Sequence, residues 1–144
     1  METSLIEQLD KSRYSLIKWL SLGWIVWYGT FIAKGLINSK LLIGSILIVG
    51  LIGWIFFTIN LIRFIRLGKK INANTKLKEA LSNEMHQFYA YKSIFWGFWT
   101  IIATICVFIV ITIFHEISAL IVCELTLFVG ISSSLIANLV YNRG

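Results

Sequence analysis

The chain has 144 residues, of which 58% are hydrophobic, and a formal net charge of +6 at neutral pH. Its mean hydropathy of +0.81 excludes an ordinary soluble domain and predicts one integral membrane domain over residues 1–144. Most of the basic charge lies beside apolar segments, where cytoplasmic lysine and arginine are expected, so the pI of about 9.5 does not indicate nucleic-acid binding.

The first apolar segment, residues 15–33, is predicted to be a transmembrane helix. Its 19 residues are enough to cross a hydrocarbon core of about 30 Å. No A-x-A cleavage pattern follows it, so we expect a retained helix and not a signal peptide. Residues 1–14 are polar, and Leu5, Ile6 and Leu9 are spaced as in a short helix lying on the membrane surface.

Residues 41–62 form the second predicted span, which contains 22 residues and no charge. Gly44, Gly50 and Gly53 would let a neighbouring helix approach closely. Because no strict GxxxG motif is present, we favour packing inside one bundle over dimerisation. The helix is expected to continue beyond the membrane until Gly68 ends it.

The interval 63–92 is the one long charged segment, and it separates two apolar halves. It carries seven basic residues against Glu79 and Glu84, which is +5 of the net charge of +6. Lysine and arginine accumulate in cytoplasmic loops, so this connector predicts two hairpins with both chain termini in the cytoplasm. Its basic residues form a candidate docking surface for anionic lipid head groups or a protein partner: Arg63, Arg66, Lys69, Lys70, Lys76, Lys78 and Lys92.

Apolar residues recur at helical spacing in the second half of the connector. Leu77, Leu81, Met85 and Phe88 follow one another at intervals of four, four and three, which indicates an amphipathic helix that covers lipid or a partner. Two forms remain open: a helix that continues into the third span, and a short interfacial helix followed by a bend.

Residues 93–114 and 117–140 are predicted to form the second hairpin. The third span opens with four aromatic residues that are typical of the belt at a membrane interface: Phe95, Trp96, Phe98 and Trp99. His115 and Glu116 make the turn. No lysine or arginine occurs from residue 93 until the arginine near the C-terminus, so this turn is expected outside.

Glu124 is the only acidic residue inside an apolar segment. Ionisable side chains within a membrane are costly and by default suggest function. On a helical wheel Asn138 lies within about 40° of it, so this polar face is expected to point into the protein. The depth of a residue in the membrane can be estimated from its distance along the helix to the nearest loop. Such estimates, together with the polar face, define a candidate intramembrane polar cluster: Glu124, Trp24, Trp54, Thr104 and Asn138.

Three interpretations of Glu124 compete: a proton- or cation-coupling site, a neutral hydrogen-bonded contact between helices, and a metal site with Cys106 and Cys123. Two thiols and one carboxylate without a nearby histidine are a poor ligand set. We therefore expect no metal and favour the hydrogen-bonded contact, with an indole N–H of Trp24 or Trp54 or the Thr104 hydroxyl as its partner.

Sequence motifs of catalysis do not occur. The chain has no CxxC pair, no HExxH and no glycine-rich phosphate loop, so no cofactor is expected, and a non-enzymatic role is favoured over a membrane enzyme that uses scattered residues. The two cysteines lie in different apolar segments and do not indicate a redox compartment.

The connector and the third span resemble a pattern found in small uncharacterised bacterial inner-membrane proteins with four transmembrane helices. In that pattern an Ala-Leu-x-Asp-Glu element ends the connector and a Gly-Phe-Trp element follows in the third span. Asn83 stands in place of the aspartate here, and Met85 in place of an arginine. The matching residues are Ala80, Leu81, Glu84, Gly97, Phe98 and Trp99. The resemblance implies a bacterial inner-membrane protein of this topology and no particular activity.

These observations predict an all-α integral membrane four-helix bundle made of two hairpins. The expected function is that of a non-enzymatic accessory, regulatory or immunity-type protein that binds a partner, through contact with another protein or self-association, in the inner (plasma) membrane. The alternative is an oligomeric pore or a small-solute, proton-coupled transporter that uses Glu124. A transporter needs this carboxylate accessible to water, whereas a binding protein tolerates glutamine there.

Overall fold

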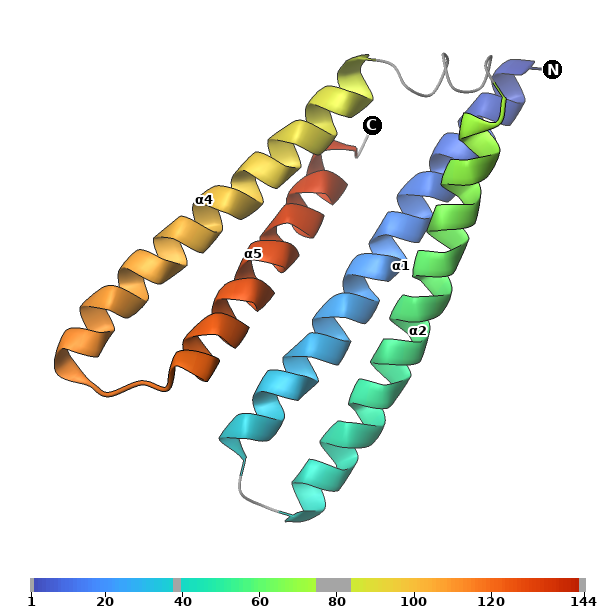
Figure 1. The fold of residues 1–144 in the computed structure, drawn as a ribbon. Coiled ribbons are helices and arrows are strands. Elements are labelled where there is room, and N and C mark those ends of the chain that lie inside the picture. Colours follow the sequence, from blue (N-terminus) through green and yellow to red (C-terminus); the bar gives the residue numbers. More distant parts are fainter. Residues whose placement is uncertain (1, 38–39, 75–83, 143–144) are drawn as a thin grey trace.

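A computed structural model describes residues 2–37, 40–74 and 84–142 of the chain. These residues form four helices (Figure 1): α1 (Glu2–Leu36), α2 (Lys40–Asn72), α4 (Glu84–Phe114) and α5 (Ala119–Tyr141). Each helix is long and apolar enough to cross a membrane. The prediction of an all-helical fold is thereby confirmed for the described residues, with four helices long and apolar enough to span a membrane.

The four helices stand side by side as two antiparallel hairpins, in the spatial order α2, α1, α5, α4 (Figure 1). Helices α1 and α2 form one hairpin and α4 and α5 the other, and the main contact between the hairpins joins α1 to α5. The turns inside the hairpins share one end of the molecule. The start of α1, the end of α2 and the start of α4 lie at the opposite end (Figure 1).

Helices α1 and α2 are longer than a membrane requires. At about 1.5 Å per residue, α1 with 35 residues measures roughly 52 Å, and α2 with 33 residues roughly 50 Å. The expectation of a separate surface helix in residues 1–14 is wrong, because the described part of this segment, from Glu2 onward, belongs to the continuous helix α1. Both helices therefore extend beyond a hydrocarbon core of about 30 Å.

Gly68 does not end α2, contrary to the sequence-based expectation, since the helix continues to Asn72. No described glycine has a positive φ, so Gly68 does not adopt the left-handed conformation that closes many helices. A glycine inside a helix lowers its stability by only about 1 kcal/mol relative to alanine. A long helix can therefore continue through it.

Helix α4 settles the two forms that the sequence left open for the start of the third span. It runs without a bend from Glu84 through Ser93 to Phe114. Leu77 and Leu81 lie outside the described residues, as do Lys76 and Lys78. The aromatic residues at the start of the predicted span are thus carried on a helix that begins before that span.

Close glycine contacts hold each hairpin together. A Cβ added to Gly53 would lie 2.9 Å from the backbone nitrogen of Trp27, and one on Gly23 would lie 2.9 Å from that of Phe57. In the second hairpin, a Cβ on Gly97 would lie 3.0 Å from the carbonyl oxygen of Gly130. Small residues let membrane helices approach in this way because no side chain separates the backbones.

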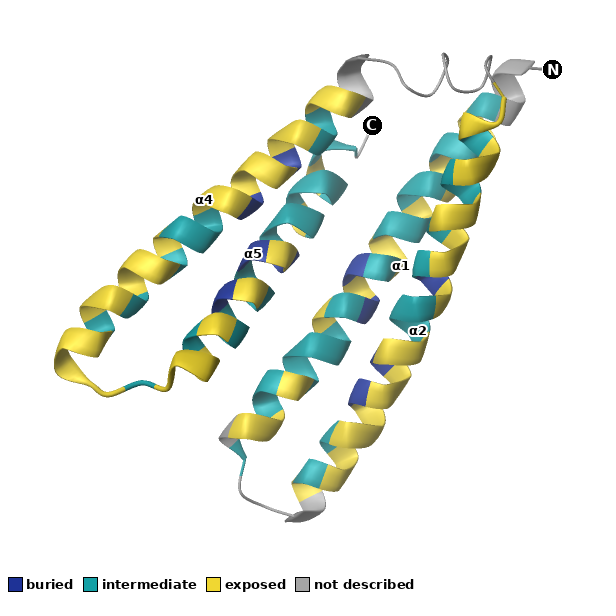
Figure 2. Cartoon of the chain, viewed as in Figure 1, coloured by how far each residue is buried: buried dark blue, intermediate teal, exposed yellow. Residues whose placement is uncertain are grey.

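One aromatic pair joins the two hairpins and extends an aromatic cluster on α1. Tyr28 of α1 stacks on Phe128 of α5, with ring centroids 5.9 Å apart and an interplanar angle of 8°, and Trp24 stacks on Tyr28 at 4.9 Å. The outer helices are much less covered: only 6% of the most apolar window of α2 and of α4 is buried. Figure 2 shows their outward sides as exposed, which is expected of surfaces that face lipid.

Candidate functional site

The end of α2 that extends beyond the apolar span carries a basic face. Arg63, Arg66, Lys69 and Lys70 are all exposed, and residues 63–74 contain no acidic residue. On a helical wheel the first two and Lys70 fall within about 60°. Lys69 and Lys70 lie in the last turn, where basic side chains interact favourably with the helix dipole. We call these four residues the α2 basic face.

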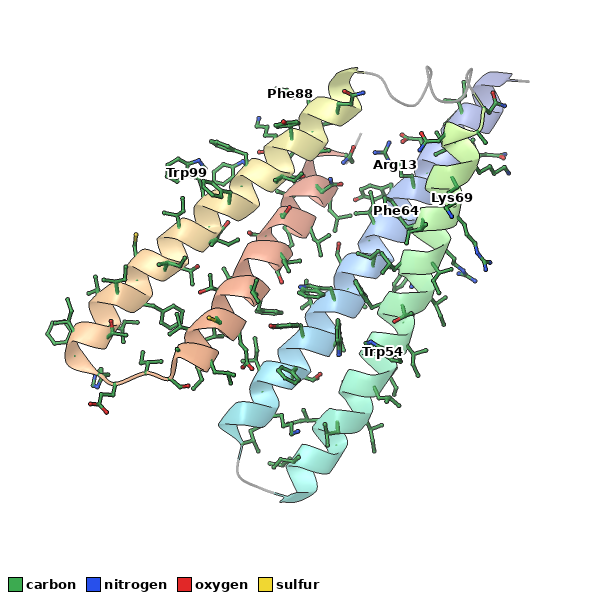
Figure 3. The ribbon with its side chains drawn as sticks, viewed as in Figure 1. Arg13, Trp54, Phe64, Lys69, Phe88 and Trp99 are labelled. Carbon is green, nitrogen blue, oxygen red and sulfur yellow. The ribbon has the colours of Figure 1, made fainter. Side chains whose placement is uncertain are left out.

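The N-terminal part of α1 supports this face from behind. Phe64 and Leu67 of α2 are half-buried, as are Leu9 and Arg13 of α1, and Figure 3 shows Arg13, Phe64 and Lys69 at the same end of the hairpin. The register seen at Gly53 and Trp27, if continued, brings Arg13 level with Leu67. The basic residues are therefore carried on a two-helix extension and not on an irregular loop.

Glu7, on the part of α1 beside the α2 basic face, has its ion pair within its own helix. Glu7 pairs with Lys11 of its own helix, with 3.0 Å between its Oε1 and the lysine Nζ. Both side chains are largely exposed, so this pair contributes little to stability. The Glu7 carboxylate is therefore already paired with a lysine of α1.

Lys92, which the sequence grouped with the basic docking residues, occupies a different place. Its ammonium group lies 4.7 Å from the ring centroid of Tyr141 and 5.8 Å from that of Phe88. The indole Nε1 of Trp96 donates a hydrogen bond to the Tyr141 hydroxyl at 2.6 Å, and Tyr89 stacks on the same ring. Lys92 and Trp96 thus fasten the end of α5 to α4, in addition to lying near the membrane interface.

Tyr141 was missed by the sequence reasoning, although one signal pointed to it. It follows the last apolar residue of the fourth span, Val140, where interfacial aromatic residues are typical. Its partners come from 45 to 52 residues earlier in the chain, so only the pairing of α4 with α5 reveals its role.

Asn138 belongs to a row of polar contacts between α4 and α5. Its Nδ2 donates to Ser93 Oγ at 3.3 Å, and its Oδ1 accepts from Asn142 Nδ2 at 2.9 Å. Nearer the centre of the helices, the hydroxyl groups of Thr100 and Ser133 are 2.8 Å apart. Interhelical contacts of this kind contribute about 0.6 to 2 kcal/mol each.

Glu124 is half-buried on α5, but the structure does not assemble the expected hydrogen-bonded cluster around it. Thr104 donates to the Thr100 carbonyl of its own helix, and the buried Trp24 Nε1 has no hydrogen-bond partner. Trp54 lies on α2 (Figure 3), which α1 separates from α5. Within the described segments no hydrogen bond joins Glu124 to Trp24, Trp54 or Thr104.

The two cysteines are free and exposed on α4 and α5. Within residues 2–37, 40–74 and 84–142, no group of three or more histidine, cysteine or acidic residues could hold a metal ion. Cys106 and Cys123 therefore form neither a disulfide nor part of a metal centre in this arrangement.

Comparison of the chain with protein-family models, with curated proteins and with solved structures gives no match. The α2 basic face is therefore considered from the chain's own geometry alone.

Proposed function

We propose that this chain is a non-enzymatic multi-pass protein of the bacterial inner (plasma) membrane that acts as an accessory, regulatory or immunity-type binding partner. The observation that supports it is the α2 basic face. Four exposed cations stand on a helix that another helix supports. A surface held in this way loses little conformational entropy when a partner binds.

The α2 basic face is placed in the cytoplasm by its charge. Lysine and arginine are retained on the cytoplasmic side, and the start of α1 lies at the same end of the molecule as the end of α2 (Figure 1). Both chain termini are then cytoplasmic, and the turns inside the two hairpins face the opposite side of the membrane.

The partner is expected to be an acidic protein surface. Arg63 follows the predicted span directly and is placed to meet lipid head groups. Lys70 stands seven residues further along the helix, roughly 10 Å beyond it at 1.5 Å per residue. This separation carries Lys69 and Lys70 out of the head-group layer, where they can pair with carboxylates of another protein.

In-cell photocrosslinking tests this function. A photoreactive amino acid at Asn72, beside the α2 basic face, should give a discrete protein adduct. The double variant Lys69→Glu, Lys70→Glu should reduce its yield by about tenfold or more, because like charges then face each other. Lys34→Glu, which also reverses a basic charge but at the opposite end of α1, is the matched control and should leave the adduct unchanged.

The proposal fails if the adduct survives the double reversal. It also fails if the same adduct forms with equal yield from Ile48, an exposed residue of the lipid-facing side of α2. Immunoblotting of membranes for the expressed variant separates loss of binding from loss of the protein.

A further inference from the structure

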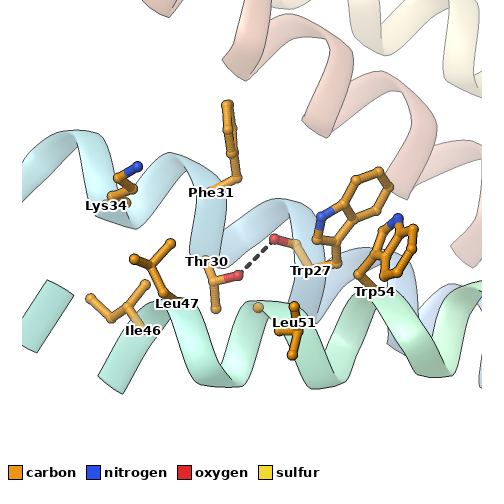
Figure 4. A pocket seen from close by; sticks show the side chains of 9 residues that line it. Trp27, Thr30, Phe31, Lys34, Ile46, Leu47, Leu51 and Trp54 are labelled. Atoms are coloured by element: carbon orange, nitrogen blue, oxygen red, sulfur yellow. Dashed lines mark hydrogen bonds between the residues drawn. The ribbon is translucent and has the colours of Figure 1, made fainter. Parts of the chain in front are cut away.

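An apolar cleft lies between α1 and α2, in the half of the hairpin that is nearest its turn (Figure 4). It encloses about 360 Å³, which is within the range of small-ligand sites. Apolar and aromatic side chains make up most of its wall, and one cation, Lys34, also lines it. The lining includes Trp27 and Lys34 of α1 and Leu47 and Trp54 of α2.

Gly50 lines this cleft and lets the two helices meet there, because it has no side chain. A Cβ at Gly50 would lie 2.6 Å from Thr30 Oγ1, so the two helices are in close contact at this level. The Thr30 hydroxyl donates to the Trp27 carbonyl oxygen at 2.7 Å, as the dashed line in Figure 4 shows. Because the Thr30 hydroxyl already makes this hydrogen bond, the wall of the cleft is mainly an apolar surface.

The cleft is open toward lipid. Helix α2 is at the edge of the row, and Leu47 and Trp54 are 51% and 47% exposed. Trp27 lies seven residues from Lys34 along α1, roughly 10 Å deeper at 1.5 Å per residue. Figure 4 shows Lys34 at one end of the group of side chains and the two indole rings at the other.

Lys34 gives the cleft its chemical selectivity. It is exposed, it lies in the last turn of α1, and it makes no ion pair with any described residue. A cation at the membrane interface next to a deeper apolar channel matches a molecule with an anionic head and a hydrocarbon tail.

We propose that this cleft binds one anionic phospholipid of the leaflet at the turn end of the hairpin. Its phosphate group pairs with the Lys34 ammonium group, and one acyl chain lies along Leu47 and reaches the rings of Trp27 and Trp54. The inference is independent of the α2 basic face, which lies at the other end of the same hairpin.

Native mass spectrometry of the full chain in detergent provides the test. Dioleoyl phosphatidylglycerol or dioleoyl phosphatidylcholine is titrated into the purified protein. Lys34→Gln should weaken retention of one phosphatidylglycerol molecule by about fivefold and leave phosphatidylcholine unchanged. Leu47→Trp, which fills the cleft from its exposed edge, should weaken both lipids. Lys11→Gln on the extension of α1 is the matched charge control and should change neither.

A phosphatidylglycerol analogue with a photoreactive acyl chain then locates the site, because peptides that contain residues 27–34 and 46–54 should carry the adduct. Equal retention of phosphatidylglycerol by the wild type, Lys34→Gln and Leu47→Trp would overturn the proposal. So would adducts confined to other helices, or crosslinks between two copies of the chain through Leu47, which would make a second copy the occupant.

Discussion

Glu124 is a half-buried acid in the part of α5 nearest the turn, and it makes no hydrogen bond to another described residue. Neither Glu124→Gln nor Glu124→Ala then removes an interhelical contact. Both variants should change the free energy of unfolding by no more than about 0.5 kcal/mol and leave the photocrosslink at Asn72 intact. Thermal unfolding in detergent and adduct yield are the two measurements.

The same pair of variants tests the alternative function. If Glu124→Gln abolishes activity in cells while the fold is retained, a proton or cation passes through this carboxylate, and the pore or transporter hypothesis replaces the binding protein. If Glu124→Ala alone lowered the free energy of unfolding by more than about 1 kcal/mol, that result would instead support the interhelical hydrogen bond that the sequence predicts.

At the scale of the helices, Gly44 and Gly53 form a matched pair. Gly53→Ala places a methyl group 2.9 Å from the Trp27 backbone nitrogen, whereas a Cβ at Gly44 meets nothing within 4 Å. Gly53→Ala should destabilise the first hairpin by roughly 1–3 kcal/mol through overpacking. Gly44→Ala should be neutral or stabilise it by up to about 1 kcal/mol through helix propensity.

Denaturation of the two glycine variants in mixed detergent micelles measures this difference. Equal stability of the two would show that α1 and α2 do not rely on close approach at Gly53. The sequence placed Gly44, Gly50 and Gly53 together as packing residues, and the structure confirms this for Gly50 and Gly53, which are buried. Gly44 is exposed, because it lies on the side of α2 that faces away from α1.

For the whole molecule, the pairing of the helices predicts which positions share a side of the membrane. Cysteine replacing Gly35 or Ser118, on a background without Cys106 and Cys123, should react with an impermeant thiol reagent added to intact cells. Cysteine replacing Asn74 should react only after the membrane is permeabilised, because the positively charged end is retained in the cytoplasm.

All three replaced residues are exposed, so accessibility within the protein does not distinguish them. Labelling of Gly35→Cys and Ser118→Cys from opposite sides would contradict the antiparallel pairing of both hairpins. Reversal of all three results would keep the fold and place the α2 basic face outside the cell, which would remove the cytoplasmic partner from the proposed function.

The sequence alone determined the number and approximate bounds of the membrane-spanning segments, because hydrophobic length is a local property of the chain. The sequence predicted the ends of the helices less well: Gly68 was expected to end α2, but the helix continues past it. The contacts were decided only by the tertiary structure. The spans are apolar around most of their circumference, so no stripe marks the side that meets a neighbour. Only the order α2, α1, α5, α4 separates Trp54 from Glu124, brings Tyr141 under Lys92 and leaves the cleft beside Lys34 at the outer edge of the row.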